Sequence, residues 1–185
     1  MNVWYSLSEI PGNEASVVTI GNFDGMHNGH KKVISTCVER AHKLGVDAVA
    51  ITFDPHPIQV HKPEVGLQLI SPLRDRLDAM AAAGLDATLV AHYDASVYSL
   101  EADEFVYEYL VERCGAREVV VGEDFRFGRG NAGTIDTLRE LGRRYGFNVI
   151  TVTDIEAPEG RRWSSSWVRE LLAAGDVSGA ARVLG

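Results

Sequence analysis

Two histidines three positions apart, His27 and His30, are the first residues whose spacing indicates chemistry. They follow an apolar run and a stretch that contains Gly21 and Gly25, and they begin a segment of helical periodicity. On the first turn of a helix they would share one face. Imidazoles there can donate hydrogen bonds to phosphate oxygens, and the free backbone amides attract an anion. The pattern favours phosphoryl or nucleotidyl transfer, which needs positioning and charge stabilisation more than a protein nucleophile.

Two other interpretations of this loop stay open. Asp24, His27 and His30 could supply three ligands to a zinc ion, although no further cluster of cysteine and histidine supports such a site. The histidines could also be exposed residues of a structural helix cap. The glycines, and the position between an expected strand and an expected helix, argue against a mere cap.

A second group of polar and aromatic residues follows the next apolar run. Pro55 and Pro57 restrict the backbone of Asp54 and His56 and predict a rigid turn. This turn presents the ring of Phe53, a carboxylate and an imidazole at the end of a strand, and a plain loop is the alternative.

Two phenylalanines alternate with an arginine later in the chain, in the run Asp124-Phe125-Arg126-Phe127. Flat apolar faces beside a guanidinium could stack a planar ring and pair with a phosphate. The alternative is that Phe125 and Phe127 are core residues on either side of a surface arginine.

The glycines that come next match a dinucleotide-binding pattern. Gly128, Gly130 and Gly133 have the G-x-G-x-x-G spacing, and a strand-like run ends at Asp154. A nicotinamide-dependent oxidoreductase is therefore a rival interpretation. We favour a turn capped by Thr134, because the glycines do not directly follow a strand and do not lie in the opening unit of the fold.

Three consecutive serines, Ser164, Ser165 and Ser166, precede a short apolar helix that carries Arg169. Serines are common N-caps, so capping alone is one interpretation. Three hydroxyls and a cation at a helix N-terminus would also hold a triphosphate.

Alternating strands and helices must position these residues. Expected strands cover residues 16–20, 48–53, 87–93, 118–121 and 148–152, and expected helices cover 29–44, 73–83, 102–114, 134–145, 167–174 and 177–184. The strands are near-continuous apolar runs, which is typical of strands covered on both faces. The sequence predicts one α/β domain over residues 1–185, a Rossmann-like, doubly wound, mainly parallel sheet of about five strands with helices on both faces. Ligands bind beyond the carboxyl ends of such strands, where the motifs lie. The long connection 54–70 shows no clear element.

Composition narrows the possible partners. The 26 acidic and 18 basic residues give a net charge of −8, which argues against nucleic acid as a partner. No segment resembles a signal peptide or approaches the length of a membrane span, and two distant cysteines fit a reducing compartment. We therefore expect a cytoplasmic protein that binds small molecules and no membrane.

The motifs resemble those of a known family. His27-Asn28-Gly29-His30 is similar to the H-x-G-H motif of the nucleotidylyltransferase superfamily. Four runs resemble, in order, the motifs of the FMN adenylyltransferase (FAD synthetase) module of bacterial bifunctional riboflavin kinase/FAD synthetases. They are residues 21–30, residues 53–57, residues 122–128 and residues 161–170, which we call the serine segment. The sequence departs from the family pattern at Trp163, where an aliphatic residue is usual, and at Ser166, where threonine is usual.

The resemblance implies transfer of AMP from ATP to FMN, with Mg²⁺ bridging the ATP phosphates and no metal held by the protein alone. It implies catalytic roles for His27, His30, Ser164, Ser165 and Arg169. The implied ATP-binding residues are Gly21, Asn22, Phe23, Asp24, Gly25, His27, Gly29, His30, Ser164, Ser165, Ser166 and Arg169. The implied flavin-binding residues are Phe53, Asp54, Pro55, His56, Pro57, Asp124, Phe125, Arg126 and Phe127.

Three further expectations follow. The riboflavin kinase module of the family is expected to be absent from this chain. A riboflavin kinase module, either separate or fused, is a possible partner. A nucleotidylyltransferase with another phosphorylated acceptor remains an alternative. So does a flavin- or nucleotide-binding protein without catalysis, because Trp163 and Trp167 place bulky rings beside the serines.

Overall fold

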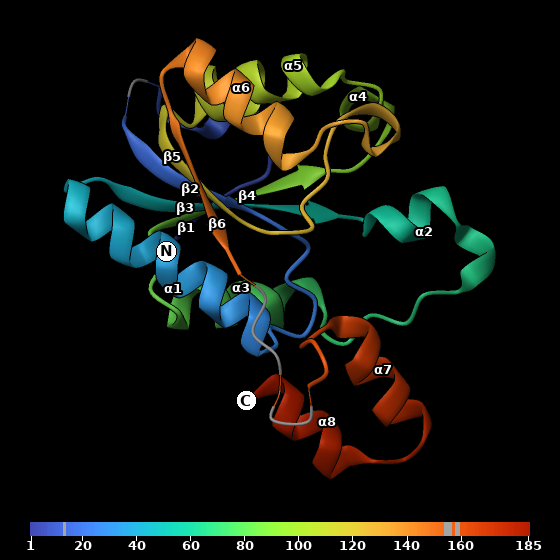
Figure 1. The fold of residues 1–185 in the computed structure, drawn as a ribbon. Helices are drawn as coiled ribbons and strands as arrows, with labels where there is room; N and C mark the ends of the chain where they lie inside the picture. Colours follow the sequence, from blue (N-terminus) through green and yellow to red (C-terminus); the bar gives the residue numbers. More distant parts are fainter. Residues whose placement is uncertain (13, 154–156, 158–159) are drawn as a thin grey trace.

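The computed structural model describes residues 1–12, 14–153, 157 and 160–185, and its centre is a six-stranded parallel sheet (Figure 1). The strands are β1 (Asn2–Trp4), β2 (Ser16–Ile20), β3 (Asp47–Asp54), β4 (Ala87–His92), β5 (Ala116–Gly122) and β6 (Asn148–Val152). Their order is β1-β4-β3-β2-β5-β6, and all five pairings are parallel. The predicted α/β fold is confirmed. The sheet has one strand more than expected, because the three-residue edge strand β1 is too short to carry a periodic signal.

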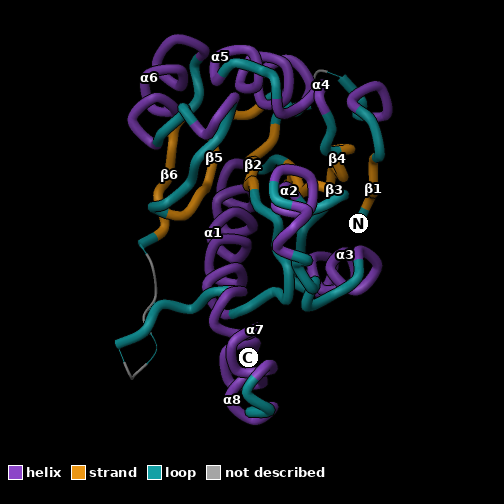
Figure 2. The backbone as a smooth tube through the Cα atoms, turned by 90° about the vertical axis from the view of Figure 1, so that its right-hand side faces the viewer, coloured by secondary structure: helices purple, strands orange, loops and turns teal. Residues whose placement is uncertain are grey.

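Helices cover both faces of the sheet (Figures 1 and 2). One face carries α1 (Asn28–Leu44) and α3 (Leu73–Ala82), and the other carries α5 (Ala102–Phe105), its π-helical continuation Val106–Arg113 and α6 (Ile135–Tyr145). Separate cores fill the two faces: Ile34, Cys37 and Met80 belong to one, and Leu110 and Leu138 to the other. Because the four inner strands are packed on both sides, their apolar runs do not alternate.

A helical pair, α7 (Ser165–Ala173) and α8 (Val177–Leu184), lies beyond the N-terminal end of α1 (Figures 1 and 2). Its own small core contains Val168, Ala180 and Val183, against which Trp163 and Trp167 pack. The rings of the two tryptophans are 5.5 Å apart. Their bulk therefore has a packing role, which the sequence alone did not explain.

The long connection is more ordered than the sequence indicated. It contains α2 (Pro57–His61) and the 3-10 turn Pro63–Val65. The imidazole Nδ1 of His56 accepts from the amide of Ile58, and Gln59 accepts from the amide of His56, so a capping box begins α2 at Pro57. α2 projects beyond the carboxyl end of β3 (Figure 1), and α4 (Ala95–Tyr98) follows β4.

The strand order reverses between β2 and β5. Apart from β1, the strands run outward from β2 to β3 and β4 on one side and from β5 to β6 on the other. Parallel sheets open a crevice at such a point, beyond the carboxyl ends of the two central strands. The loops after Ile20 and after Gly122 therefore face each other. Within the described residues, no helix combines the length and apolar character needed to cross a bilayer.

Candidate active site

His27 and His30 lie together at the start of α1. His27 is the N-cap, and its Nδ1 accepts a hydrogen bond from the backbone N–H of His30 at 3.3 Å. The two rings stack with centroids 3.6 Å apart, and the ring of Phe23 meets His30 edge-on at 5.3 Å. Because Nδ1 of His27 accepts, its neutral ring carries the proton on Nε2, which is left as a donor.

Burial keeps both imidazoles neutral. It lowers the pKa of His27 from 6.5 to about 4, and the nearby charge of Arg162 adds to this decrease while Asp24 opposes it. Burial also holds the pKa of His30 well below its usual range, with His27 and Arg162 adding to the shift. The Nδ1 atom of His30 is buried and has no hydrogen-bond partner among the described residues.

Asp24 connects three segments that are distant in sequence. Its carboxylate is 1% exposed and accepts hydrogen bonds from the backbone amides of Ile70 and Ser71, each at 3.0 Å. It also forms an ion pair with Arg169, whose Nε donates to the carbonyl of Gln68 at 2.8 Å. Asp24 and Arg169 therefore join the first loop, the end of the long connection and α7.

The serine segment faces the histidine loop. Ser164 is the N-cap of α7 and accepts from the amide of Trp167 at 3.2 Å, while the hydroxyl of Ser165 donates to the carbonyl of Asp24 at 2.8 Å. Ser166 is exposed. The helix begins two residues earlier than expected because Ser164 caps it.

A cavity of about 530 Å³ lies between the first loop and the serine segment. Of the residues expected to bind ATP, it is lined by Gly21, Phe23, His27, Gly29, His30 and Ser164. A side chain at Gly29 would stand 3.1 Å from the His27 ring and 3.5 Å from the carbonyl of Trp163, so the two walls approach closely at this glycine.

The remaining residues expected at ATP lie elsewhere. Asn22 lines a neighbouring cavity, and Asp24, Gly25, Ser165, Ser166 and Arg169 do not line this one. Arg162, which was not expected at ATP, lines the 530 Å³ cavity. Its Nη2 lies 2.9 Å from Oδ2 of Asp124, and this ion pair links the serine segment to the loop after β5. The sequence placed Arg162 next to the serines, but nothing in it distinguished Arg162 from Arg161 or Arg169.

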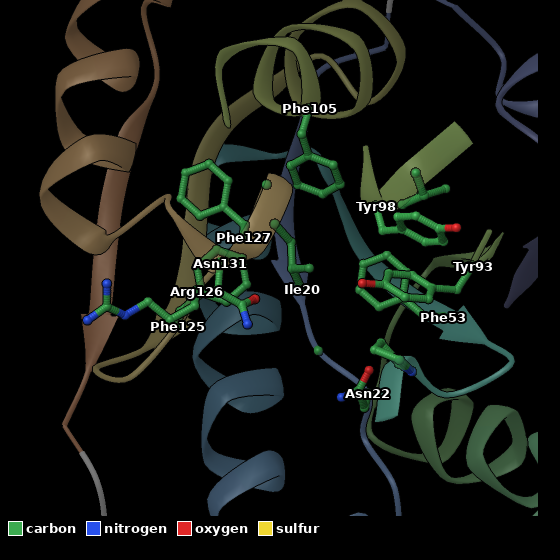
Figure 3. Close-up of a pocket in the computed structure, with 14 residues that line it drawn as sticks. Ile20, Asn22, Phe53, Tyr93, Tyr98, Phe105, Phe125, Arg126, Phe127 and Asn131 are labelled. Atoms are coloured by element: carbon green, nitrogen blue, oxygen red, sulfur yellow. The ribbon is translucent and has the colours of Figure 1, made fainter. Parts of the chain in front are cut away.

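A second cavity, of about 210 Å³, adjoins the first and shares Ile20, Gly21 and Phe125 with it (Figure 3). Aromatic rings dominate its lining. Of the residues expected at the flavin, Phe53, Pro57, Phe125, Arg126 and Phe127 line it. Figure 3 shows the Arg126 guanidinium pointing away from the rings.

Sequence reasoning missed part of this lining, namely Tyr93, Val97, Tyr98, Phe105 and Asn131. Tyr93 directly follows β4, so the rule that ligands bind beyond strand ends could have found it. The hydroxyl of Tyr93 lies 2.9 Å from Nε2 of His61 at the end of α2. Phe105 and Asn131 come from other segments and carry no local signal.

Four other residues expected at the flavin have different surroundings. His56 caps α2, and Asp124 lies at the first cavity. Asp54 and Pro55 do not line the second cavity, and the Asp54 carboxylate is 3.4 Å from Nη2 of Arg76. Arg76 itself is fully buried and was missed by the sequence analysis.

The zinc site and the dinucleotide-binding glycine run find little geometric support. Within the described ranges, no three histidine, cysteine or acidic side chains are grouped so that they could hold a metal, and the Asp24 carboxylate is directed to Arg169 and backbone amides. The glycine run forms a turn whose Phe127 pairs with Gly133, and Thr134 caps α6 by accepting from the amide of Thr137. Asp154 lies outside the described residues.

Comparisons with known proteins agree on one family. The family described as FAD synthetase matches residues 9–167. The chain is 37% identical over 175 residues to the bifunctional riboflavin kinase/FMN adenylyltransferase of Pseudomonas fluorescens, covering 95% of this chain and 56% of that protein. The corresponding Escherichia coli (strain K12) protein is 34% identical over 181 residues, which cover 98% of this chain and 57% of that one. The chain thus spans little more than half of these relatives.

A shorter relative and two solved structures complete the comparison. A Geobacillus thermodenitrificans protein with the same two activities in its name is 38% identical over 95% of this chain and 91% of its own length. A Streptococcus pneumoniae structure named as a macrolide-efflux protein has a TM-score of 0.85 and 26% identity, over 100% of this chain and 61% of that one. Pantothenate synthetase from Thermus thermophilus, with a TM-score of 0.61 and 14% identity over 100% of this chain and 80% of that one, shares the fold.

The buried histidines predict a stability that depends on pH. The pKa of His27 is lower in the folded chain than in the unfolded chain, so the unfolded chain binds more protons as the pH falls from about 6.5 towards about 4. The contribution of His27 to the free energy of unfolding should therefore be fully present above about pH 6.5 and be lost as the pH falls. For His27 alone, the free energy of unfolding should decrease by roughly 2 kcal/mol between pH 7 and pH 5. Urea unfolding at the two pH values measures this, and His27→Gln should flatten the dependence. His92→Gln, at an exposed histidine, is the control. Identical pH dependence in wild type and His27→Gln would contradict the assignment.

The Asp24 contacts predict a large loss of stability in Asp24→Asn. The amide cannot neutralise Arg169 while also accepting the two backbone N–H groups, and breaking a buried ion pair costs about 3–5 kcal/mol. Asp136→Asn is the matched control, because the Asp136 side chain is 91% exposed and pairs with Arg139 at the surface. That change should cost less than about 1 kcal/mol. Similar midpoints of urea unfolding for the two variants would argue against Asp24 as a structural connection.

Proposed function

The chain belongs to the FAD synthetase family, and from this membership we propose that it transfers the AMP group of ATP to FMN, giving FAD and pyrophosphate. One observation carries the proposal. A cavity lined by two imidazoles and a cavity lined by aromatic rings share Ile20, Gly21 and Phe125. Two substrates bound side by side in these cavities would meet at the carboxyl end of β2.

We assign the triphosphate of magnesium-bound ATP to the larger cavity. Nε2–H of His27 is a donor fixed in direction, since Nδ1 is occupied by the His30 amide. The start of α1 adds backbone amides and a positive dipole end. The ring of His30 also lines the cavity, and its buried Nδ1 has no hydrogen-bond partner among the described residues. We assign both imidazoles to the oxygens of the α-phosphate, with Mg²⁺ entering as part of the ATP complex.

The acceptor phosphate is its own nucleophile. An oxygen of the FMN phosphate attacks the α-phosphorus and forms the new P–O bond. The bond from the α-phosphorus to the bridging oxygen of the β-phosphate breaks, and pyrophosphate leaves with that electron pair. No proton has to be removed from the nucleophile, so no protein base is required. The protein contributes alignment and donors for the charge that develops on the α-phosphate oxygens.

The leaving pyrophosphate belongs beside α7. Ser164 and Arg162 line the cavity there, so we assign both to the β- and γ-phosphates, and exposed Ser166 lies on the same helical turn. Ser165 and Arg169 bond to Asp24, and we assign them to holding the N-terminus of α7 opposite the histidines. Arg169 thus acts through the placement of the helix rather than as the principal phosphate cation.

The aromatic cavity suits the flavin ring. Phe125 and Phe127 are stacked with centroids 5.4 Å apart, and Phe53 meets Tyr93 edge-on at 5.4 Å. Such faces bind a planar aromatic ring by stacking and by burial of its faces. Pro57 on α2 also lines this cavity.

The direct test is to incubate the purified chain with ATP, Mg²⁺ and FMN and to measure FAD and pyrophosphate by chromatography. His27→Ala and His30→Ala should each reduce kcat at least roughly a hundredfold, because one lost donor to a developing charge costs about 3–4 kcal/mol. Both should remain folded by circular dichroism, and His92→Ala is the exposed control.

FMN binding without FAD formation by the wild type would favour a non-catalytic binding protein. Turnover only with another phosphorylated acceptor, such as pantetheine phosphate, would replace FMN.

The neighbouring arginines Arg161 and Arg162 make a matched pair. Arg161 is paired with Glu170 and lies over the Trp167 ring at 4.9 Å, whereas Arg162 lines the cavity. Arg162→Gln should raise the KM for ATP roughly tenfold, since a charge-assisted contact to phosphate contributes about 1.5–3 kcal/mol. Arg161→Gln should change it less than about twofold, in line with a surface ion pair. Equal KM values for the two variants would remove Arg162 from the phosphate site.

A further inference from the structure

We propose that Arg76, on α3, is a positioning residue that fixes the acceptor side of the site by holding the carbonyls of Asn22 and Phe53 at the same time. The proposal rests on the function above and assigns to Arg76 no contact with either substrate. It gives a role to the largest fully buried side chain of the described residues, which no motif of the sequence had singled out.

The contacts of Arg76 join the two loops that border the acceptor cavity. Nη1 donates to the carbonyl of Asn22 at 2.9 Å and is 3.4 Å from the carbonyl of Phe53. Nη2 lies 3.4 Å from Oδ1 of Asp54. Asn22 follows β2 and Phe53 is the penultimate residue of β3, so one guanidinium connects the carboxyl ends of two neighbouring strands.

Both carbonyls belong to residues that line the aromatic cavity, and neither residue lines the histidine cavity. A displacement of Arg76 would therefore be transmitted first to the acceptor side. The planar guanidinium presents several N–H donors in a fixed fork, which a lysine ammonium cannot reproduce. The position thus requires the shape of arginine as well as its charge.

Stability alone does not explain the burial of this cation. The Arg76 side chain is 0% exposed, while that of its ion-pair partner Asp54 is 44% exposed. The distance between Nη2 of Arg76 and Oδ1 of Asp54 is 3.4 Å, so the pair is long and partly solvated. The buried carboxylate of Asp24 is already paired with Arg169. Replacing buried ionic groups by apolar residues is often neutral or stabilising. A buried arginine whose ion-pair partner is 44% exposed and 3.4 Å away is better explained by the two backbone carbonyls that it orients.

A second donor to the same carbonyl allows an independent check. The hydroxyl of Thr52 donates to the carbonyl of Asn22 at 3.2 Å. Thr52 is fully buried on β3, so Thr52→Val conserves its shape and removes one donor. If the direction of the Asn22 carbonyl shapes the acceptor cavity, this smaller change must affect the same kinetic constant as a change at Arg76.

The test compares KM values for FMN and ATP, and the Kd for FMN from quenching of its fluorescence. Arg76→Lys should raise the KM and Kd for FMN roughly tenfold, the effect of losing one charge-assisted bond, and leave the KM for ATP within about twofold. Thr52→Val should raise the FMN constants in the same direction by a smaller factor. Arg74→Lys, on the same helix with a 90% exposed side chain, should change nothing. Arg40→Lys, which disturbs the pair with the buried Glu118, controls for a general loss of stability.

Each outcome decides the proposal. Equal changes in both KM values, or no change in the FMN constants of a folded Arg76→Lys, would overturn it, as would an Arg40→Lys variant with the same selective loss. If Arg76→Lys does not fold, Thr52→Val decides, and unchanged FMN constants in that variant overturn the proposal. Absence of FAD formation by the wild type refutes the proposed function instead, and is recognised because it precedes any comparison of variants.

Discussion

The arrangement of the candidate site depends on the buried carboxylate of Asp24. A carboxylate that is 1% exposed must be compensated by several donors, and here they come from Ile70, Ser71 and Arg169. These donors belong to the end of the long connection and to α7, which are 46 to 145 positions away in the chain. Satisfying one charge therefore brings together three segments, and α7 begins across from the imidazoles as a result.

The parallel sheet supplies the second constraint, because it decides which strand ends are neighbours. β2 lies between β3 and β5, so the loop after β2 borders both cavities. The larger cavity is lined by this loop, the loop after β5 and the serine segment. The aromatic cavity is lined by the ends of β3 and β4, by α2 and again by the loop after β5. Two substrates bound in these cavities would meet at the residues common to both, among which Gly21 carries no side chain.

Local patterns predicted what local interactions determine. The buried strands could be recognised from apolar runs, and the positions of His27 and His30 from their spacing at a helix start. The edge strand β1 could not be, because three residues carry no period and pairing with β4 alone defines it. The partners of Asp24 and Arg76, the choice of Arg162 over Arg169 for the cavity, and the lining by Phe105 and Asn131 are all long-range. They depend on which distant backbone atoms the fold brings near, and single-sequence patterns do not contain that information.

The neutral state of the histidines bears on how such a site would favour the transition state. Two imidazoles stacked at 3.6 Å cannot both carry a charge in a buried position without a large cost. As neutral donors they would bind a ground-state triphosphate less tightly than cations, so less of their interaction free energy would be spent before the reaction begins. Their dipoles are already oriented by the helix start and would interact more strongly as charge accumulates on the α-phosphate oxygens in a site of low dielectric constant. The permanent charge, from Arg162, stands at the other wall of the cavity, where pyrophosphate would leave.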